Sequence, residues 1–288
     1  MQLSSQQISG STNVVGILGW PVSHSLSPLM HNAAFQKLRL NFTYIPLPCP
    51  PDQLEKAISG LRAMGIKGAN VTIPHKEAVI PFLDRLTPIA EKMQTVNTLF
   101  WENGELVGTT TDPYGALANL RASGYSPNNQ PLLIVGTGGA ARALSFAFAL
   151  DYPQMPLTFA FRAEDQKQVE KLIAELKEKS EATIQLLPLS QLSSSLSKFN
   201  LIINATPVGM HPLEDKTPFD TSLLLSGQWV YDIVYTPRET RLLRDAKNKG
   251  CHAVEGLGML LHQGAKSFQF WTGREAPIEV MAAALNLE

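Results

Sequence analysis

The sequence has little of several features that mark particular protein classes. Only two of its 288 residues are cysteine, Cys49 and Cys251, which excludes a disulfide framework and a cysteine-rich metal site. Neither sign of charge dominates, because 24 Lys and Arg stand against 25 Asp and Glu. We therefore expect no nucleic-acid partner and no polybasic membrane surface. The most apolar stretch, residues 144–150, is far shorter than the ~20 residues that span a bilayer.

Signals for export and for metal binding are also missing. Residues 1–12 lack the basic region and apolar core of a secretory signal, and the histidines have no spacing typical of a zinc site, so no metal is expected. Hydrophobic residues make up 44% of the chain, enough for full cores, and the length suits two domains of roughly 100–200 residues. The composition predicts a cytoplasmic protein of two domains.

Short β-branched runs alternate with helical patterns along the chain, which predicts parallel α/β sheets. Asn103 and Gly104 separate two apolar runs and predict a hairpin with a type I′ turn, placed at an antiparallel edge of the first sheet. We expect strands at residues 14–18, 42–47, 68–71, 97–101, 105–108, 131–135, 157–161, 199–203 and 229–234. Helices are expected at 28–38, 51–64, 164–178, 240–249, 258–270 and 277–287, with further ones opened by Pro74 and near Pro113.

A glycine-rich turn, residues 136–141, joins a predicted strand directly to an apolar helix. This order of strand, turn and helix is the context of a dinucleotide-binding fingerprint. Gly136 permits the tight turn, and Gly138 lets the backbone approach a pyrophosphate that the free N–H groups of the helix can bind. By itself the pattern also fits a plain turn between a strand and a helix.

The next strand ends at Arg162, where a dinucleotide enzyme would contact the ribose. A guanidinium suits the 2′-phosphate of NADP, whereas an NAD enzyme typically has an acidic residue there. Glu164 and Asp165 follow closely, so NADP is favoured while NAD use stays open. Arg162 could also be an ordinary solvated strand end.

Ser25 and Ser27 carry two hydroxyls two residues apart. In an extended segment both side chains point to the same face, where they could hold a carboxylate. Ser27 has a second interpretation, because a serine directly before Pro28 is a typical helix N-cap.

Lys76 and Asp112 are the candidate proton carriers. The helix predicted after Pro74 would place Lys76 in its first turn, where the helix dipole disfavours an ammonium ion, and this indicates a chemical role. Asp112 precedes Pro113 as an ordinary N-cap would. A carboxylate beside Lys76 would instead favour the charged lysine and oppose the dipole.

Taken together, these motifs resemble the shikimate dehydrogenase family, including its quinate/shikimate relatives. The similarity runs from Gly19 to Gly273, and the number and order of the matching segments make it specific. They are residues 25–28, 70–76, 96–98, Asp112, the glycine turn, and residues 204–207, 231–237, 256–263 and 271–273.

The resemblance implies a fold and a reaction. The fold is an N-terminal α/β substrate domain and a Rossmann-type NADP domain, with C-terminal helices returning to the substrate domain. The implied substrate domain comprises residues 1–112 and 258–288, and the implied NADP domain comprises residues 113–257. The substrate is expected in the cleft. The implied reaction is the reversible NADP-dependent reduction of 3-dehydroshikimate to shikimate, on the pathway to chorismate and aromatic amino acids. A small-molecule substrate is thus expected, and a homodimer is one assembly left open.

The resemblance also assigns roles to individual residues. Lys76 is implied as the catalytic proton carrier with Asp112 as its partner. The implied substrate contacts are Ser25, Ser27, Thr72, Asn97, Asp112, Tyr235 and Gln263. The implied cofactor contacts are Gly136, Thr137, Gly138, Gly139, Ala140, Arg162, Ile233 and Gly256.

The chain departs from the family pattern at two places. The family often has Asn-Arg-Thr at the ribose and a basic residue four positions after the Arg, but this chain has Phe161, Arg162 and Ala163, then Gln166. Pro113 also stands where the family commonly has glycine after Asp112. Two alternatives stay open: a quinate/shikimate dehydrogenase with NAD or dual cofactor use, and an NADP-sensing module without catalysis. Quinate-preferring relatives tend to have Thr at the second serine, so Ser27 favours shikimate.

Overall fold

The computed structural model describes residues 8–287, so most of the N-terminal segment inspected for a signal lies outside the described part. Contacts within the chain divide it into two compact units. Unit 1 comprises Met1–Thr111 and Leu260–Glu288, and unit 2 comprises Asp112–Met259. The predicted limits differ at three residues: they assign Asp112, Gly258 and Met259 to the substrate domain, whereas the contacts assign them to unit 2. Within residues 8–287, no helix is both long enough and apolar enough to cross a membrane.

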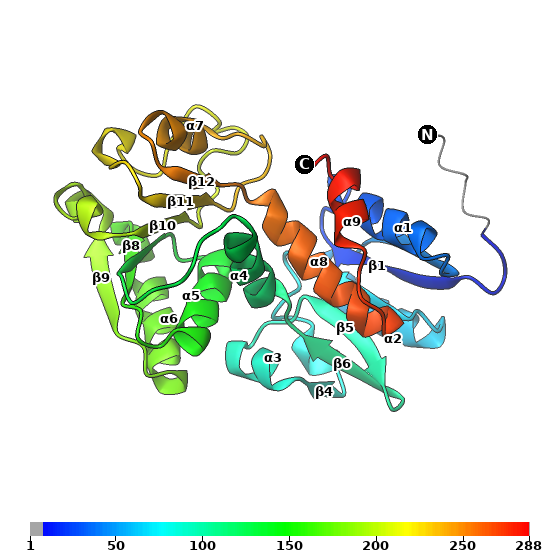
Figure 1. Cartoon of the computed structure of the whole chain (residues 1–288). Helices are drawn as coiled ribbons and strands as arrows, with labels where there is room; N and C mark the ends of the chain where they lie inside the picture. The colour runs from blue at the N-terminus through cyan, green and yellow to red at the C-terminus, as the bar shows by residue number, and fades with distance from the viewer. Residues whose placement is uncertain (1–7, 288) are drawn as a thin grey trace. The chain divides into compact units, whose positions relative to one another are not determined.

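Unit 1 is built on a mixed six-stranded sheet with the order β2-β1-β3-β5-β6-β4 (Figure 1). Its strands are β1 (Asn13–Gly19), β2 (Phe42–Pro48), β3 (Gly68–Val71), β4 (Arg85–Leu86), β5 (Thr98–Glu102) and β6 (Glu105–Thr109). Its helices are α1 (Ser27–Lys37), α2 (Leu54–Ala63), α3 (Pro88–Met93), α9 (Ile278–Ala284) and most of α8 (Leu257–Thr272). β1 pairs in parallel with β2 and β3, while β5 runs antiparallel to β3 and to β6.

The predicted hairpin is present, but it is not the edge of the sheet. Asn103 and Gly104 both have positive φ, 52° and 86°, as a type I′ turn requires. Beyond β6 the two-residue strand β4 adds in parallel and forms the edge. β4 is too short to leave a pattern in the sequence, so the expectation of an antiparallel edge was wrong.

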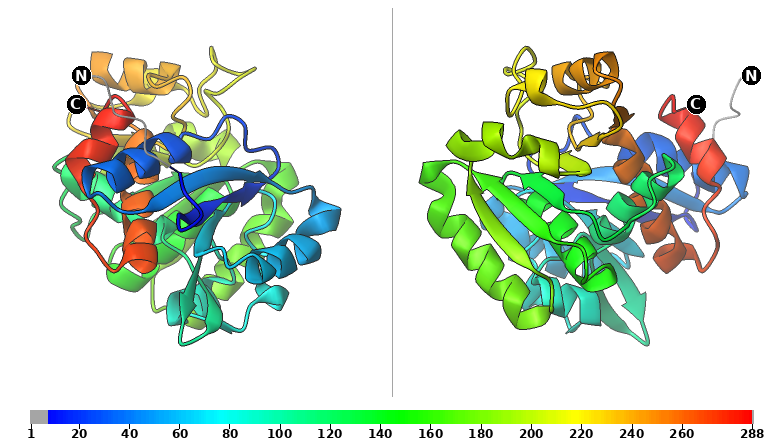
Figure 2. Two further views of the ribbon diagram at one scale, coloured as in Figure 1. Left: turned by 90° about the vertical axis from the view of Figure 1, so that its right-hand side faces the viewer. Right: turned by 60° about the vertical axis from the view of Figure 1, so that its left-hand side comes forward.

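Two apolar layers cover the sheet of unit 1. On one face α2 contributes Ile58 and Leu61 to a core that also includes Leu18 and Val71. A second cluster is aromatic: Phe35 of α1 stacks on Phe268 of α8, with ring centroids 5.2 Å apart. Each buried aromatic ring removes some 150–250 Å² of surface from water, so these contacts attach α8 to the N-terminal sheet. Both views of Figure 2 also show α9 beside α1.

Unit 2 is a doubly wound, all-parallel sheet with the order β12-β11-β10-β7-β8-β9. Its central strands are fully buried and mostly apolar, as expected when helices cover both faces. α5 and α6 lie on one face and α7 on the other (Figure 1). The strands are β7 (Leu132–Val135), β8 (Leu157–Phe161), β9 (Ile184–Pro188), β10 (Leu201–Asn204), β11 (Trp229–Asp232) and β12 (His252–Val254), and the helices are α4 (Asp112–Ala122), α5 (Gly139–Asp151), α6 (Gln166–Lys179) and α7 (Arg241–Asn248).

Candidate active site

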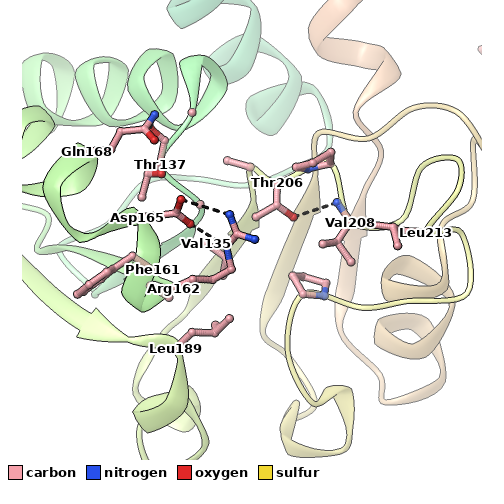
Figure 3. Close-up of a pocket in the computed structure, with 16 residues that line it drawn as sticks. Val135, Thr137, Phe161, Arg162, Asp165, Gln168, Leu189, Thr206, Val208 and Leu213 are labelled. Carbon is pink, nitrogen blue, oxygen red and sulfur yellow. Dashed lines mark hydrogen bonds and ion pairs between the residues drawn. The ribbon is translucent and has the colours of Figure 1, made fainter.

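The glycine turn of unit 2 lines a pocket of about 340 Å³ at the carboxyl end of β7 (Figure 3). Gly136 has φ +113°, and a Cβ there would lie 2.9 Å from the carbonyl oxygen of Ala205, so only glycine fits. A Cβ on Gly138 would meet no atom within 4 Å, so its backbone faces open space. The pocket therefore has the close-approach surface that a pyrophosphate needs.

α5 begins directly at this turn. Gly138 is its N-cap and supplies no side chain to cap it, and Gly139 and Ala140 form the first turn. The first N–H groups of a helix have no partner within the helix and carry the positive end of its dipole. Thr137 is held from the side by Gln168 of α6, a residue that the sequence analysis missed, whose Nε2 donates to the Thr137 carbonyl at 3.0 Å. The start of α5 is thus a ready site for an anion.

Arg162 lies on the same side of the pocket as Thr137, where its guanidinium is held by acidic neighbours (Figure 3). Nε donates to Asp165 Oδ2 at 2.8 Å and Nη2 donates to Asp165 Oδ1 at 3.2 Å, while Nη1 lies 3.3 Å from Glu164 Oε1. Hydrogen bonding to Asp165 raises the pKa of Arg162. The cation follows the carboxyl end of β8 and lines the pocket, but a bound phosphate would have to share it with Asp165.

Four other predicted residues of unit 2, Ile233, Tyr235, Gly256 and Asp112, follow the carboxyl ends of strands or begin a helix. A Cβ on Gly256 would lie 2.4 Å from the Ile233 carbonyl oxygen, so the segments carrying these two residues are in direct contact. Tyr235 follows on the same loop as Ile233, and burial raises the pKa of its hydroxyl. Asp112 is the first residue of α4.

The two serines of unit 1 do not lie in an extended segment, so that premise for placing both side chains on one face was wrong. Ser27 is the first residue of α1, after Leu26 in αR conformation, and is not its N-cap. Ser25 occupies a turn, and its Oγ accepts from the Ser27 backbone N–H at 3.3 Å. The hydroxyl that serves the start of the helix therefore belongs to Ser25. Ser27 is buried within hydrogen-bonding reach of the Tyr44 hydroxyl.

The helix expected to open at Pro74 is absent, so the dipole argument for Lys76 was wrong. Residues 74–79 form turns that lead to a short 3₁₀ helix, Ile80–Phe82. The Lys76 carbonyl accepts from Val96 N–H at 2.8 Å, and the buried His75 ring donates from Nε2 to the Cys49 carbonyl at 2.7 Å. These tertiary bonds, and not a helix, fix the backbone that carries Lys76.

A buried polar network joins the start of β5 to α8 in unit 1. Asn97 Nδ2 donates to Gln263 Oε1 at 3.2 Å and to Thr111 Oγ1 at 2.9 Å, and Asn97 Oδ1 accepts from Thr111 N–H at 2.8 Å. Ser267 Oγ lies 2.8 Å from Thr98 Oγ1 and accepts from Asn70 Nδ2 at 3.0 Å. Asn97 and Gln263, both predicted substrate contacts, lie 166 residues apart in the sequence. The structure brings them together.

Thr72 and Lys76 lie near the same network. Thr72 follows β3, whose last residue, Val71, donates its N–H to the Asn97 carbonyl at 2.8 Å, and Lys76 is bonded to the residue before Asn97. The sequence analysis gave no role to the residues that tie the network together, although Asn70 and Thr98 lie in the matching segments 70–76 and 96–98, because local sequence does not show which hydroxyls and amides will bond to one another. These residues are Tyr44, Asn70, Thr98, Thr111 and Ser267.

Comparison with known proteins identifies what these two units are similar to. Residues 17–99 match the sequence model of the shikimate dehydrogenase substrate binding domain, and residues 256–285 match that of the shikimate 5′-dehydrogenase C-terminal domain. Shikimate dehydrogenase (NADP(+)) of Methanopyrus kandleri is 44% identical over 98% of this chain and 97% of its own length, and that of Moorella thermoacetica 41% over 97% and 95%. The chain belongs to the shikimate dehydrogenase family. Its fold agrees: a crystal structure of shikimate 5-dehydrogenase from Listeria monocytogenes, in complex with shikimate and NAD, has a TM-score of 0.92 at 36% identity and covers 98% of this chain and 99% of its own.

Membership of the shikimate dehydrogenase family confirms the resemblance and the α/β fold class, a Rossmann-type sheet with C-terminal helices that rejoin the first sheet. The substrate-domain match spans the segments of Ser25, Ser27, Thr72, Lys76 and Asn97. The C-terminal match spans Gly256 and Gln263. The role of each residue in binding or catalysis stays a prediction.

Proposed function

We propose that the protein is a shikimate dehydrogenase, which reversibly oxidises shikimate to 3-dehydroshikimate with NADP⁺, a step toward chorismate and aromatic amino acids. The observation that carries this proposal is the identity above 40% to two enzymes named shikimate dehydrogenase (NADP(+)), over at least 95% of every chain compared. Its substrate is a small molecule. We expect the protein to act in the cytoplasm, and a homodimer stays a prediction.

The pocket of unit 2 fits the dinucleotide that this reaction needs. Gly136 and Gly138 would let the backbone approach the pyrophosphate, and Arg162 would face the 2′-phosphate. Ile233 and Gly256 are the residues we assign to the nicotinamide end. When bound, NADP⁺ accepts the hydride from the substrate.

The residues of unit 1 are assigned to substrate binding and proton transfer. Hydroxyls of Ser25 and Ser27 can donate to a carboxylate without placing a positive charge next to it. Oxidation of the alcohol releases a proton, which the neutral amine of Lys76 would accept, and in reduction its ammonium would donate one to the developing alkoxide. Asn97 and Gln263 would bond ring hydroxyls from an orientation that the buried network already fixes.

A spectrophotometric assay at 340 nm tests the function. The full chain is supplied with shikimate or quinate, each with NADP⁺ or NAD⁺. We expect the highest kcat/KM with shikimate and NADP⁺. A higher kcat/KM with quinate would replace this proposal by the quinate/shikimate alternative, and NADP⁺ binding without reduction by either alcohol would favour the non-catalytic module.

Replacing Arg162 with alanine is expected to change cofactor preference. Because the guanidinium is the cation at the ribose end of the pocket, Arg162→Ala should lower kcat/KM for NADP⁺ by about tenfold and leave that for NAD⁺ within about twofold. Steady-state kinetics with both cofactors measures the ratio. Arg244→Ala removes another exposed arginine of unit 2, on α7, and is the control. An equal loss with both cofactors would contradict a role at the 2′-phosphate.

A further inference from the structure

A buried hydrogen-bond network joins the two loops that follow β10 and β11 in unit 2. Asn204 and Asp232 are the last residues of these parallel strands, are partners in the strand register, and have no exposed surface. Asp232 Oδ1 accepts from Asn204 Nδ2 at 2.9 Å and from Val234 N–H at 3.1 Å. Asp232 Oδ2 accepts from the Thr240 hydroxyl at 2.6 Å. One carboxylate therefore connects β10, the loop after β11 and the N-cap of α7.

Through Asn204, this carboxylate reaches the wall of the nucleotide pocket. Asn204 Oδ1 accepts from the Thr206 N–H at 3.0 Å and from the Thr206 hydroxyl, and Asn204 Nδ2 donates to the Val208 carbonyl at 3.0 Å. Thr206 and Val208 line the pocket across from Arg162 (Figure 3). Asp232 fixes which way the Asn204 amide faces, because its oxygen can accept only from the NH₂ end.

The second branch of the network reaches the loop that carries Ile233. Val234 N–H donates to Asp232, and Ile233 N–H donates to the Asn204 carbonyl at 3.1 Å. Two consecutive backbone N–H groups of the loop are thus bonded to the Asn204–Asp232 pair. The Ile233 carbonyl in turn faces Gly256, where no Cβ could fit.

A purely stabilising role fits Asp232 poorly. Its donors are an amide, a backbone N–H and a hydroxyl, none of which carries a positive charge, and burial raises the pKa of this carboxyl to about 6. Burying an ionised carboxylate without a cation disfavours folding. The contribution of the Asp232 side chain is to fix the positions of its three donors, and through them the conformation of two loops.

We infer that Asp232 is a positioning residue for the dinucleotide, holding the pocket wall through Asn204 and the backbone beside the nicotinamide through Val234. The inference rests on the proposed function, since it takes NADP as the ligand of the pocket. Asp232 itself is buried behind both loops and acts through them.

Isothermal titration of the full chain with NADP⁺, without shikimate, tests the inference. Asp232→Ala leaves the Asn204 amide and Val234 N–H without their acceptor, and we expect NADP⁺ to bind about tenfold more weakly. Asp232→Asn should bind within about threefold of wild type, because its oxygen can replace Oδ1 and its NH₂ can donate to Thr240 Oγ1. In steady-state kinetics, KM for NADP⁺ should rise while KM for shikimate stays unchanged.

Gln228→Ala is the matched control. Gln228 directly precedes β11 at its opposite end, and its buried side chain also makes three hydrogen bonds: it accepts from Leu225 N–H and donates to the carbonyls of Leu196 and Phe199. We expect this variant to lose stability in urea unfolding and to keep its affinity for NADP⁺. Equal weakening by Asp232→Ala and Gln228→Ala would overturn the inference, as would Asp232→Ala binding like wild type.

If the Asp232→Ala variant does not fold, NADP⁺ binding by the Thr240→Val variant tests the inference instead. Removing the Thr240 hydroxyl leaves Oδ2 without its donor, so NADP⁺ should bind several-fold more weakly and Thr240→Ser should restore binding. Unchanged binding by Thr240→Val would overturn the inference. Failure of the wild-type protein to bind NADP⁺ would overturn the proposed function and the inference together, whereas normal wild-type binding with insensitive variants would overturn the inference alone.

Discussion

Replacing Lys76 with alanine is expected to lower kcat for shikimate oxidation by about 10²- to 10⁴-fold, with only a modest change in KM for shikimate. That range is what a positioned general acid or base typically contributes. KM should change little because the carboxylate and ring hydroxyls would still be held by Ser25, Ser27 and the Asn97 network. Initial rates at 340 nm over a range of shikimate concentrations give both constants.

The structure indicates that Lys76→Ala will fold. The bonds that hold this segment come from the Lys76 carbonyl and from the ring of His75, and alanine leaves both in place. Lys67→Ala is the matched control, since Lys67 is exposed and precedes β3, at the opposite end of the strand that leads to Lys76. A near-normal kcat for Lys76→Ala would show that another group carries the proton.

Much of the fold could be predicted from local sequence. Fully buried strands such as β7 (Leu132–Val135) are continuous apolar runs, and the glycine turn at Gly136 is required by backbone geometry that no other residue supplies. The edge strand β2 was expected at residues 42–47, but the edge strands β4, β9 and β12 could not be predicted in the same way. β12 has three residues and β9 alternates weakly, so neither carries a pattern that separates it from a loop.

Lys76 shows why the site was harder to predict than the fold. Pro74 followed by charged residues is a normal helix start, but tertiary bonds hold this segment in another conformation: the Ile73 carbonyl accepts from Trp20 N–H and the Lys76 carbonyl from Val96 N–H. These partners, directly after β1 and shortly before β5, are distant in the sequence, and local propensity does not report them. The same applies to Thr111 and Ser267, whose importance becomes visible only when α8 lies against β5 and β3.

Acidification is expected to destabilise unit 1 through His31. The ring is fully buried among Tyr44, Phe35, Phe268 and Trp271 and stacks on Tyr44 with centroids 4.5 Å apart. Within residues 8–287, neither ring nitrogen finds a hydrogen-bond partner. Burial lowers the pKa of His31 to about 3, so the folded protein binds this proton far more weakly than the unfolded chain.

The sign follows from linkage between folding and protonation. Above pH 6.5, the ordinary pKa of histidine, His31 is neutral in both states. Below pH 6.5 the unfolded chain binds a proton at His31, whereas the folded chain does not bind it until about pH 3. Stability is thus lost as pH falls through this window, by about 2 kcal/mol at pH 5 and roughly 4 kcal/mol by pH 3. Asp232 acts in the opposite direction, because its raised pKa, about 6, lets the folded state take up a proton first. The pH dependence of the whole protein therefore combines these two effects with those of other groups, such as His262, whose pKa burial also lowers.

His31→Phe separates the two contributions, because phenylalanine keeps an aromatic ring in the stack and does not titrate. Urea unfolding at pH 7.5 and pH 5.0 should show wild type losing about 2 kcal/mol more than His31→Phe over this interval, whatever the variant's stability at pH 7.5. His24→Gln, which removes an exposed histidine of the same unit, should follow the wild-type pH dependence. An identical pH dependence for wild type and His31→Phe would mean that the folded state protonates His31 as readily as the unfolded chain does. The aromatic cluster would then have to open to water well before unit 1 unfolds.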